Sequence, residues 1–386
     1  MVHLLLLIIY LSFVSLGLPD ALLGAAWPTM SAGLAVPLSY AGGISMIISI
    51  HTVVSSLMAD RMNRFLGTGR VTAISVGMTA AALFGFSVSR EYWQLCLWAI
   101  PYGLGAGSVD ASLNNYVAIH YASRHMSWLH CMWGLGASVG PYLMGLALSA
   151  GMGWVGGYRM IALLQLGLTV VLVVSLPLWK KTAAPSGETG GSTPGIWRTL
   201  KIPGVKKAVL AFACYCAMEQ SCMLWAGSYL VLNAGMAEET AAAFAGIYVL
   251  GIAVGRLLSG FLTMKLSDKA LVRLGEGLVL AGIFILLLGK SAAVPGLLLM
   301  GLGSAPVYPC MVHATPGHFG QEHSQAVIGL QSAGAFAGIC AMPPLFGLLA
   351  QRFGVYLLPW YLLVILLALT LTHESLNRKN EPLPVK

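Results

Sequence analysis

The chain repeats itself at an offset of 198 residues. Trp27 pairs with Trp225 (225 − 27 = 198), and the run GLGAGSVD at 103–110 pairs with GLGSAPVY at 301–308. Glycines and loop histidines keep the same offset, with Gly136 and Gly140 on Gly334 and Gly338, and His120 and His125 on His318 and His323. A period this long predicts two similar structural units in one chain.

The solvent for most of this chain is lipid. Its 386 residues are 58% hydrophobic and only 9% charged, and the mean hydropathy is +0.81. A soluble domain needs about a quarter of its residues charged to cover its surface. The composition therefore excludes a water-soluble globule and predicts a membrane protein.

Apolar runs close to the ~20 residues that a helix needs to cross the hydrocarbon core divide the chain into twelve spans. They lie at 4–30, 38–60, 70–88, 92–119, 127–150, 157–179, 208–233, 240–264, 270–289, 293–313, 325–350 and 354–373. The alternating pattern of a membrane β-barrel is absent from the sequence, so helices must satisfy the backbone. We expect an all-α membrane protein with two pseudo-symmetric six-helix bundles, which is typical of a secondary transporter whose site lies between its halves.

One composition break separates the two predicted bundles. Residues 180–207 are rich in Gly, Ser, Thr and Pro and have basic ends, which is typical of a linker. We expect an N-terminal bundle at 1–179, a cytoplasmic linker at 180–207, a C-terminal bundle at 208–376 and a cytoplasmic tail at 377–386.

Basic loops predict the orientation, because cationic loops stay in the cytoplasm. A cytoplasmic N-terminus places sixteen of the 21 Lys and Arg residues inside and four outside, namely Arg90, Arg159, Lys290 and Arg352. The first span has no cationic leader or cleavage site and is expected to be retained. We expect a multi-pass protein of the cell membrane, of the bacterial inner-membrane type, with both termini cytoplasmic and no nucleic-acid partner.

Three acids lie inside apolar spans, where a charge costs at least ~2.5–3.5 kcal/mol on insertion scales. Asp20 follows Gly17 and Pro19 in a segment expected to be kinked, Asp110 lies in the fourth span and Glu219 lies in the seventh. A carboxyl group that is neutral in one access state and ionised in the other can carry a proton with a substrate. We predict that all three face one central cavity and serve proton coupling; the alternative is that they satisfy a kinked backbone or a polar neighbour.

Further polar and aromatic side chains are candidates for substrate binding. Trp27 and Trp225 occupy equivalent positions beyond Asp20 and Glu219, and either stack on a sugar ring or belong to an interfacial aromatic belt. The polar candidates, each with a helix-packing alternative, are Asn114, Asn115, His130, Tyr308 and Gln331. The seven cysteines lie in or beside apolar spans, and their spacing predicts no disulfide, metal site or cofactor.

With these residues in view, the chain resembles the major facilitator superfamily, and within it the fucose permease branch of sugar–proton symporters. The resemblance rests on GLPDALLGAAWP, GLGAGSVDASLNNYVAIH, WLHCMWGLGASVGP, GRLLSGF, GLGSAPVYPCMVHATP and IGLQSAGAFAG. It implies that Asp20 and Asp110 serve substrate binding and proton coupling. It also implies gating roles for Asp60, Arg61 and Arg64 in SSLMADRMNRFLG, where both signature glycines are replaced, and for Arg256 at the matching place in the second half.

These observations predict a proton-coupled carrier of a monosaccharide or small polyol that works by alternating access as a monomer. The alternative on the same scaffold is a proton-driven exporter of drugs or metabolites. An enzyme would need a nucleophile with its base or a metal set, which the sequence does not offer. A channel would need a symmetric ring of like groups, whereas Asp110 is matched by Tyr308.

Overall fold

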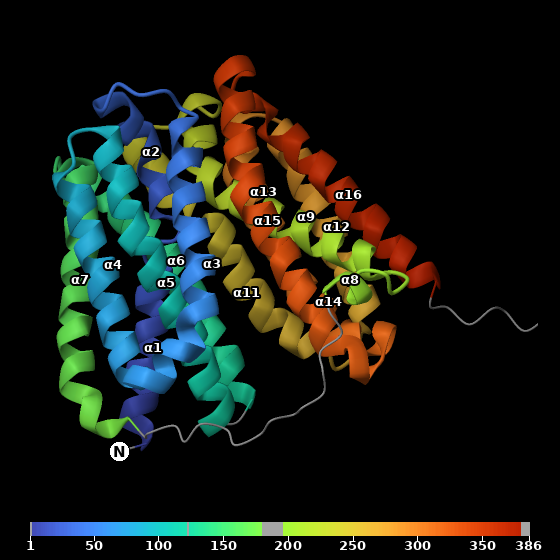
Figure 1. The fold of residues 1–386 in the computed structure, drawn as a ribbon. Helices are drawn as coiled ribbons and strands as arrows, with labels where there is room; N and C mark the ends of the chain where they lie inside the picture. The colour runs from blue at the N-terminus through green and yellow to red at the C-terminus, as the bar shows by residue number, and fades with distance from the viewer. Residues whose placement is uncertain (1, 122, 180–195, 380–386) are drawn as a thin grey trace, which may run out of the picture.

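The computed structural model describes residues 2–121, 123–179 and 196–379, and within these ranges the secondary structure is entirely helical (Figure 1). The first half contains α1 (Val2–Gly17), α2 (Leu22–Gly33), α3 (Tyr40–Leu66), α4 (Thr68–Val88), α5 (Tyr92–His120), α6 (Ser123–Ser149), α7 (Gly153–Ser175) and the short η1 (Leu176–Leu178).

The second half begins with the four-residue α8 (Ile196–Thr199). It continues with α9 (Val205–Leu232), α10 (Glu238–Ala245), α11 (Ile247–Leu262), α12 (Asp268–Leu287), η2 (Lys290–Ala292), α13 (Ala293–Ser304), α14 (Val307–Phe319), α15 (Gln321–Phe353), η3 (Val355–Leu357) and α16 (Leu358–Lys379). The two halves stand side by side in Figure 1.

Among the described residues, eleven helical segments are long and apolar enough to cross a membrane. Three of them consist of two consecutive helices, α1 with α2, α10 with α11, and α13 with α14. The 29-residue α5 is also long enough to cross, but it is less apolar because it carries Asp110, Asn114 and Asn115. With α5 the spans are the twelve predicted, and the predicted all-helical membrane fold is confirmed.

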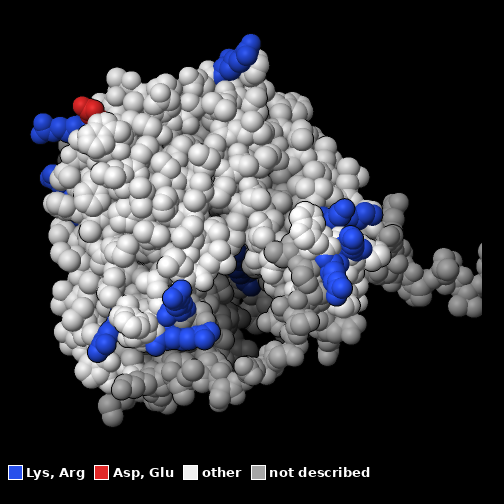
Figure 2. Space-filling view, viewed as in Figure 1, with Lys and Arg blue, Asp and Glu red and all other residues white. Residues whose placement is uncertain are grey.

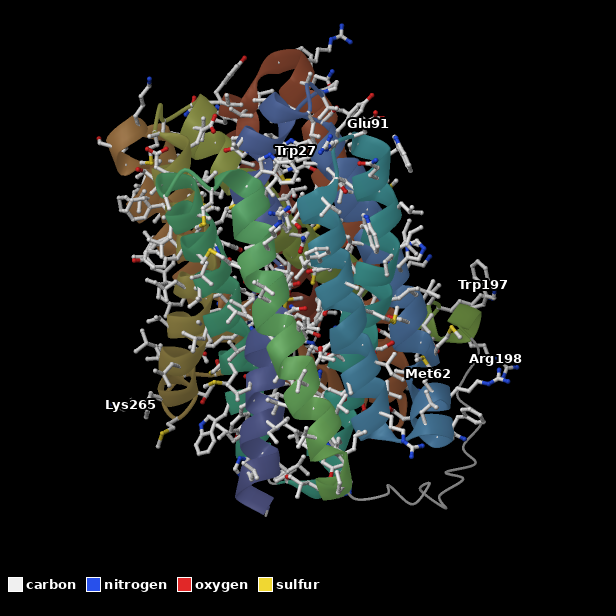
Figure 3. All side chains as sticks on the ribbon, turned by 90° about the vertical axis from the view of Figure 1, so that its left-hand side faces the viewer. Trp27, Met62, Glu91, Trp197, Arg198 and Lys265 are labelled. Carbon is white, nitrogen blue, oxygen red and sulfur yellow. The ribbon has the colours of Figure 1, made fainter. Side chains whose placement is uncertain are left out.

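Most of the predicted linker, residues 180–195, lies outside the described part of the chain. The described remainder contains α8 and the first residues of α9, and α16 continues to Lys379, three residues into the predicted tail. Trp197 is exposed on α8, away from the helix bundle (Figure 3).

Glycines place the helices of both halves in the same close contacts. A Cβ atom on Gly136 or Gly140 of α6 would meet backbone atoms of α1, and one on Gly334 or Gly338 of α15 would meet backbone atoms of α9. Glycine is needed here because only a residue without a side chain lets two helix backbones approach so closely. The sequence repeat is therefore also a repeat of packing.

Among the described residues, close backbone contacts between the two halves gather at the end of the bundle opposite the linker, which we call the closed end. A Cβ on Gly24 would meet the backbone of Leu224, one on Gly42 would meet Pro344, and one on Gly145 would meet α10. Two hydrogen bonds also join the halves there, Thr29 Oγ1 to Glu238 Oε2 at 2.7 Å and Ser39 to Gln351.

The other end, which carries the linker, is splayed; we call it the linker end. Phe65 at the end of α3 is 87% exposed and Met264 after α11 is 81% exposed. Figure 2 shows the molecule hollowed between the halves, with a basic side chain visible inside. In Figure 3, Met62 and Lys265 lie towards this end and Trp27 and Glu91 towards the closed end. The structure is thus a pair of helix bundles that is closed at one end and open at the other.

Candidate functional site

Asp20 lies in the break between α1 and α2. Helix α1 ends at Gly17 and α2 begins at Leu22, and Pro19 between them has no backbone N–H to continue a helix. The Asp20 N–H donates to the Gly17 carbonyl at 3.0 Å, which closes a turn. The predicted kink is therefore present, and it holds a half-buried carboxylate between two helix ends.

Two donors from other helices hold this carboxylate. Trp133 Nε1 of α6 donates to Asp20 Oδ2 at 2.6 Å, and the Tyr102 hydroxyl of α5 donates to Oδ1 at 3.2 Å. Gly17 brings Trp133 close, because a Cβ at that position would meet the Trp133 carbonyl. Charge-assisted bonds of this kind are about twice as strong as neutral ones.

Arg256 connects this group to the other half. Its guanidinium, on α11, lies 5.7 Å from the centre of the Trp133 ring, within the range of a cation–π interaction. It also lies within electrostatic range of Glu219 and Tyr215 on α9. A series of interactions thus crosses from one half to the other through Asp20, Trp133, Arg256 and Glu219. We call these four residues the seam network.

Asp110 joins the same region from α5. Asn114 Nδ2, one turn away, donates to Asp110 Oδ1 at 2.9 Å, and Asp110 lies within electrostatic range of Asp20. Tyr308 of α14, on the other half, lies within range of Asp110, Glu219 and Arg256. These interactions connect the three acids named from the sequence, with Tyr308 and Arg256 linking Glu219 to the other two.

Three of the other predicted residues, His130, Tyr308 and Asn115, are exposed. His130 of α6 packs against the Phe13 ring with centroids 5.9 Å apart and lies within electrostatic range of Arg256. Tyr308 is 39% exposed. Asn115 of α5 is exposed as well.

Trp27 and Trp225 occupy matching places, as predicted, but neither presents a ring face to the hollow in this conformation. Both side chains are fully buried near the closed end. The Trp27 indole donates to the Leu38 carbonyl at 2.8 Å and that of Trp225 to the Pro343 carbonyl at 2.9 Å. In this conformation they act as packing residues between helices.

Gln331 lies apart from the seam network. It is buried in α15, where the Thr315 hydroxyl donates to its Oε1 at 3.2 Å, beside a cavity within the second half.

The predicted gating residues divide between two places. Arg61 and Arg64 are exposed at the linker end of α3, and the side chain of Asp60 lies outside the described part of the structure. Arg256 belongs to the seam network.

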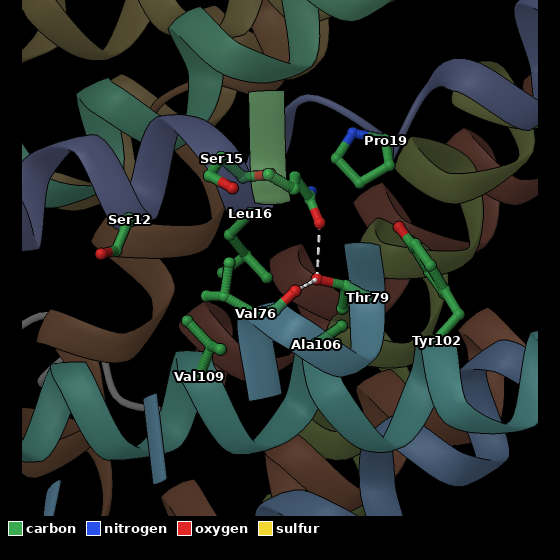
Figure 4. A pocket seen from close by; sticks show the side chains of 10 residues that line it. Ser12, Ser15, Leu16, Pro19, Val76, Thr79, Tyr102, Ala106 and Val109 are labelled. Atoms are coloured by element: carbon green, nitrogen blue, oxygen red, sulfur yellow. Dashed lines mark hydrogen bonds between the residues drawn. The ribbon is translucent and has the colours of Figure 1, made fainter. Parts of the chain in front are cut away.

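A small cavity of about 10 Å³ lies in the first half behind Asp20 (Figure 4). It is lined by Pro19 and Tyr102 and by Thr79, whose hydroxyl donates to Gln165 Oε1 at 2.6 Å. Gln165 Nε2 in turn donates to the Ser15 carbonyl at 2.9 Å. This is about the smallest space that holds one water molecule, so the cavity is too small to bind a solute.

Sequence reasoning did not single out Tyr102 and Trp133, which hold Asp20. Trp133 precedes Gly136 and Gly140 by three and seven residues on α6, the spacing of one helix face. An indole N–H on the same helix face as two repeated glycines was the available signal.

Comparison with known proteins agrees with this architecture. The family described as the Major Facilitator Superfamily matches residues 9–312 and 232–382. Bypass of stop codon protein 6 of Saccharomyces cerevisiae is 21% identical over 67% of this chain and 56% of its own length. An uncharacterised MFS-type transporter of Yersinia pestis is 26% identical over 65% of this chain and 64% of its own. The match thus spans less than two thirds of either relative.

Solved structures share the fold across the whole chain. A bacterial homologue of the lysosomal transporter Spinster, inward-facing and unoccupied, has a TM-score of 0.76 at 11% identity and covers 99% of each chain. A variant of the nucleoside transporter NupG has a TM-score of 0.78 at 13% identity, covering 97% of this chain and 99% of its own.

FucP in its outward conformation has a TM-score of 0.63 at 15% identity over 98% of this chain and 99% of its own. These similarities show a fold, and the family match covers far more than half of the sequence. The chain belongs to the Major Facilitator Superfamily, a family of transporters and not of enzymes.

Proposed function

We propose that this protein is a proton-coupled secondary transporter of a small polar solute, a monosaccharide or polyol, and that it works as a monomer by alternating access. The observation that carries the proposal is the seam network. It joins a carboxylate of the first half to a cation and a carboxylate of the second, beside the hollow between the halves.

The geometry around Asp20 gives a route from proton binding to movement of the halves. An ionised carboxylate accepts from both Trp133 and Tyr102, whereas a protonated one has fewer acceptor sites. Protonation therefore weakens the bond that orients the Trp133 indole, and that indole is the surface on which Arg256 of the other half rests. One proton on Asp20 thereby changes a contact between the halves.

The polar groups of this region suit a hydroxylated solute. The His130 ring, the Tyr308 hydroxyl and the Glu219 carboxylate supply donors and acceptors, and the Tyr308 ring supplies an apolar face. A sugar or polyol presents the complementary hydroxyl groups. The positions of Asp20 and Asp110 match the acids of the fucose permease branch, which favours the same class.

Charge supports the proposed orientation. Basic side chains at the linker end include Arg61, Arg64, Arg70, Arg198 and Lys265, whereas Lys290 in η2 and Arg352 in the last turn of α15 lie at the closed end. By the positive-inside rule the hollow faces the cytoplasm, and the conformation is inward-open. Thiol labelling of single cysteines at Arg70 and Arg352 in sealed cells would test this orientation.

The function is tested in two steps. A thermal-shift panel of hexoses, polyols, amino acids and cationic drugs on the purified chain, at two pH values, first identifies a ligand. Uptake of that ligand into proteoliposomes is then measured with and without an acid-outside pH gradient. The proposal predicts uptake that the gradient stimulates and that Asp20→Asn abolishes, whereas Glu239→Gln, an exposed acid at the closed end, changes little. Gradient-independent uptake in all three proteins would refute proton coupling.

The same preparation separates import from export. A symporter takes up protons when it binds its solute, whereas a proton-driven exporter releases them. Release on addition of a cationic drug would favour the exporter alternative.

A further inference from the structure

A second polar cavity, of about 60 Å³, lies wholly within the second half. It is bounded by α9, α12, α14, α15 and α16 towards the linker end. Its polar lining consists of Asp268, Lys269, Thr315, His318, Gln331, His373 and Asn377. None of the seam network lines it.

A chain of buried side chains leads from this cavity into the bundle. His318 interacts with the Asn377 side chain, Asn377 Nδ2 lies 3.0 Å from His373 Nε2, and His373 Nδ1 lies 3.6 Å from Glu276 Oε1. Glu276 is 5% exposed, His373 5% and Asn377 6%. Glu276 lies within an apolar span, where an acidic side chain costs insertion free energy and is therefore a candidate for a functional role.

The orientation of the Asn377 side-chain amide determines whether His373 Nε2 accepts a hydrogen bond or donates one. An amide NH₂ only donates, so Nε2 accepts and the proton of a neutral imidazole is on Nδ1, which faces Glu276. With the amide turned over, its oxygen accepts from Nε2–H, which both the neutral Nε2–H tautomer and the charged imidazolium provide. The network therefore accommodates His373 in its neutral and in its charged form.

The distance between His373 Nδ1 and Glu276 Oε1 is a further observation about this pair. At 3.6 Å the pair is beyond a direct hydrogen bond, and His373 Nδ1 and Glu276 Oε1 are buried with no other hydrogen-bond partner. Buried polar atoms in this state are normally satisfied by water. The adjoining cavity exceeds the ~10–15 Å³ that one water needs and is polar enough to hold it.

We propose that Glu276 and His373 form a proton-binding site of the second half, reached by water through this cavity and separate from Asp20 and Asp110. A single buried charge has a high free-energy cost when no opposite charge balances it. The pair therefore holds either one proton shared between the two side chains, or a second proton whose charge a neighbouring group balances. The titratable groups that surround it are Asp268, Lys269 and Arg273 on α12, Cys310, His313 and His318 on α14, Glu374 on α16 and Lys207 on α9. To the cavity lining α15 contributes only the neutral Gln331.

Four of those neighbours already interact with each other, in two pairs. Arg273 Nε donates to Glu374 Oε1 at 2.6 Å, with Nη2 on Oε2 at the same distance, and His313 Nδ1 lies 2.6 Å from Asp268 Oδ2. These pairs flank the site at the surface. Glu276 itself accepts from the Thr370 side chain, but the two atoms that face each other, Glu276 Oε1 and His373 Nδ1, have no hydrogen-bond partner among the described residues.

The test is infrared titration of the full chain in lipid nanodiscs from about pH 8 to about pH 5, a range that spans histidine and perturbed carboxyl titration. The carbonyl stretch of a protonated carboxyl reports each acid directly. We expect Glu276→Gln to remove one titrating component, and His373→Gln to shift the midpoint of that component by about one pH unit or more. Asp20→Asn should leave the component in place, which separates this site from the seam network.

Overlapping wild-type and Glu276→Gln spectra would overturn the proposal. If Glu276→Gln does not fold, His373→Gln decides, because an unmoved midpoint in that variant also overturns it. Glu91→Gln, which removes an exposed acid at the closed end, serves as the control and should leave all midpoints unchanged.

Discussion

The guanidinium of Arg256 lies 5.7 Å from the centre of the Trp133 ring, so a cation of the second half rests on an indole that belongs to the first. The N–H of that indole donates to Asp20 at 2.6 Å. The face of the indole therefore contacts the second half of the carrier, and its N–H binds an acid of the first half. Changes that separate these two contacts test the account.

Trp133→Phe removes the N–H but keeps an aromatic face for Arg256. Leaving Asp20 Oδ2 without its donor costs about 1.5–3 kcal/mol, so we expect proton-stimulated uptake to fall about tenfold or more. Initial rates in proteoliposomes measure this. Trp197→Phe, on the exposed α8, is the matched control, and equal rates in both variants would contradict the role given to the indole N–H.

Arg256→Gln removes the cation that links Trp133 to Glu219, and we expect it to abolish coupled uptake. Arg256→Lys keeps the charge but loses the planar guanidinium that stacks on a ring, so a partial loss of about tenfold is expected. Arg352 lies 5.5 Å from the Phe353 ring at the closed end. Arg352→Gln removes a similar cation–π pair outside the seam and should keep near-normal uptake; a loss as large as that of Arg256→Gln would show that the seam position is not special.

Gly24→Val places a branched side chain against the backbone of Leu224, where the two halves meet most closely. We expect the closed end to loosen and the carrier to spend more time open there. An impermeant maleimide should then label a cysteine at Ser39 several-fold faster, in a variant whose native cysteines are replaced. Gly260→Ala, where a Cβ meets no atom within 4 Å, should leave labelling unchanged. Equal labelling in both would mean that this contact does not hold the closed end shut.

Gly140→Ala tests the packing repeat. Its Cβ would meet the Leu18 backbone, and overpacking of this kind costs about 1–3 kcal/mol, so the thermal unfolding midpoint should fall. Gly167→Ala on α7 meets nothing within 4 Å and should instead stabilise the helix by about 0.5–1 kcal/mol. A comparable midpoint for the two variants would argue against the close α1 and α6 contact.

The fold followed from local patterns. Apolar runs set the spans, and the repeat that includes Gly136, Gly140, Gly334 and Gly338 indicated two similar halves. Pro19 after Gly17 indicated the break that holds Asp20. These signals are read from residue types and their positions along the chain, without knowledge of which helices contact each other.

The partners of Asp20 needed the structure, because Trp133 is 113 residues away and Tyr102 is 82 residues away. Matching positions for Trp27 and Trp225 were visible in the sequence, but their burial depends on which end of the carrier is closed. Glu276 illustrates a different failure. The sequence signal was available for it, because the cost of an acid in an apolar span applies to Glu276 as much as to Asp110. The residue that faces it, His373, needed the structure.

The central claim is that the Asp20 carboxyl carries the proton that moves with the solute. Proteoliposomes loaded with a pH-sensitive dye test it most directly, when an inward gradient of the identified sugar or polyol is imposed without any pH gradient. The account predicts acidification of the lumen with the wild-type protein and none with Asp20→Asn, although the variant still binds the solute. Unchanged acidification with Asp20→Asn would contradict it.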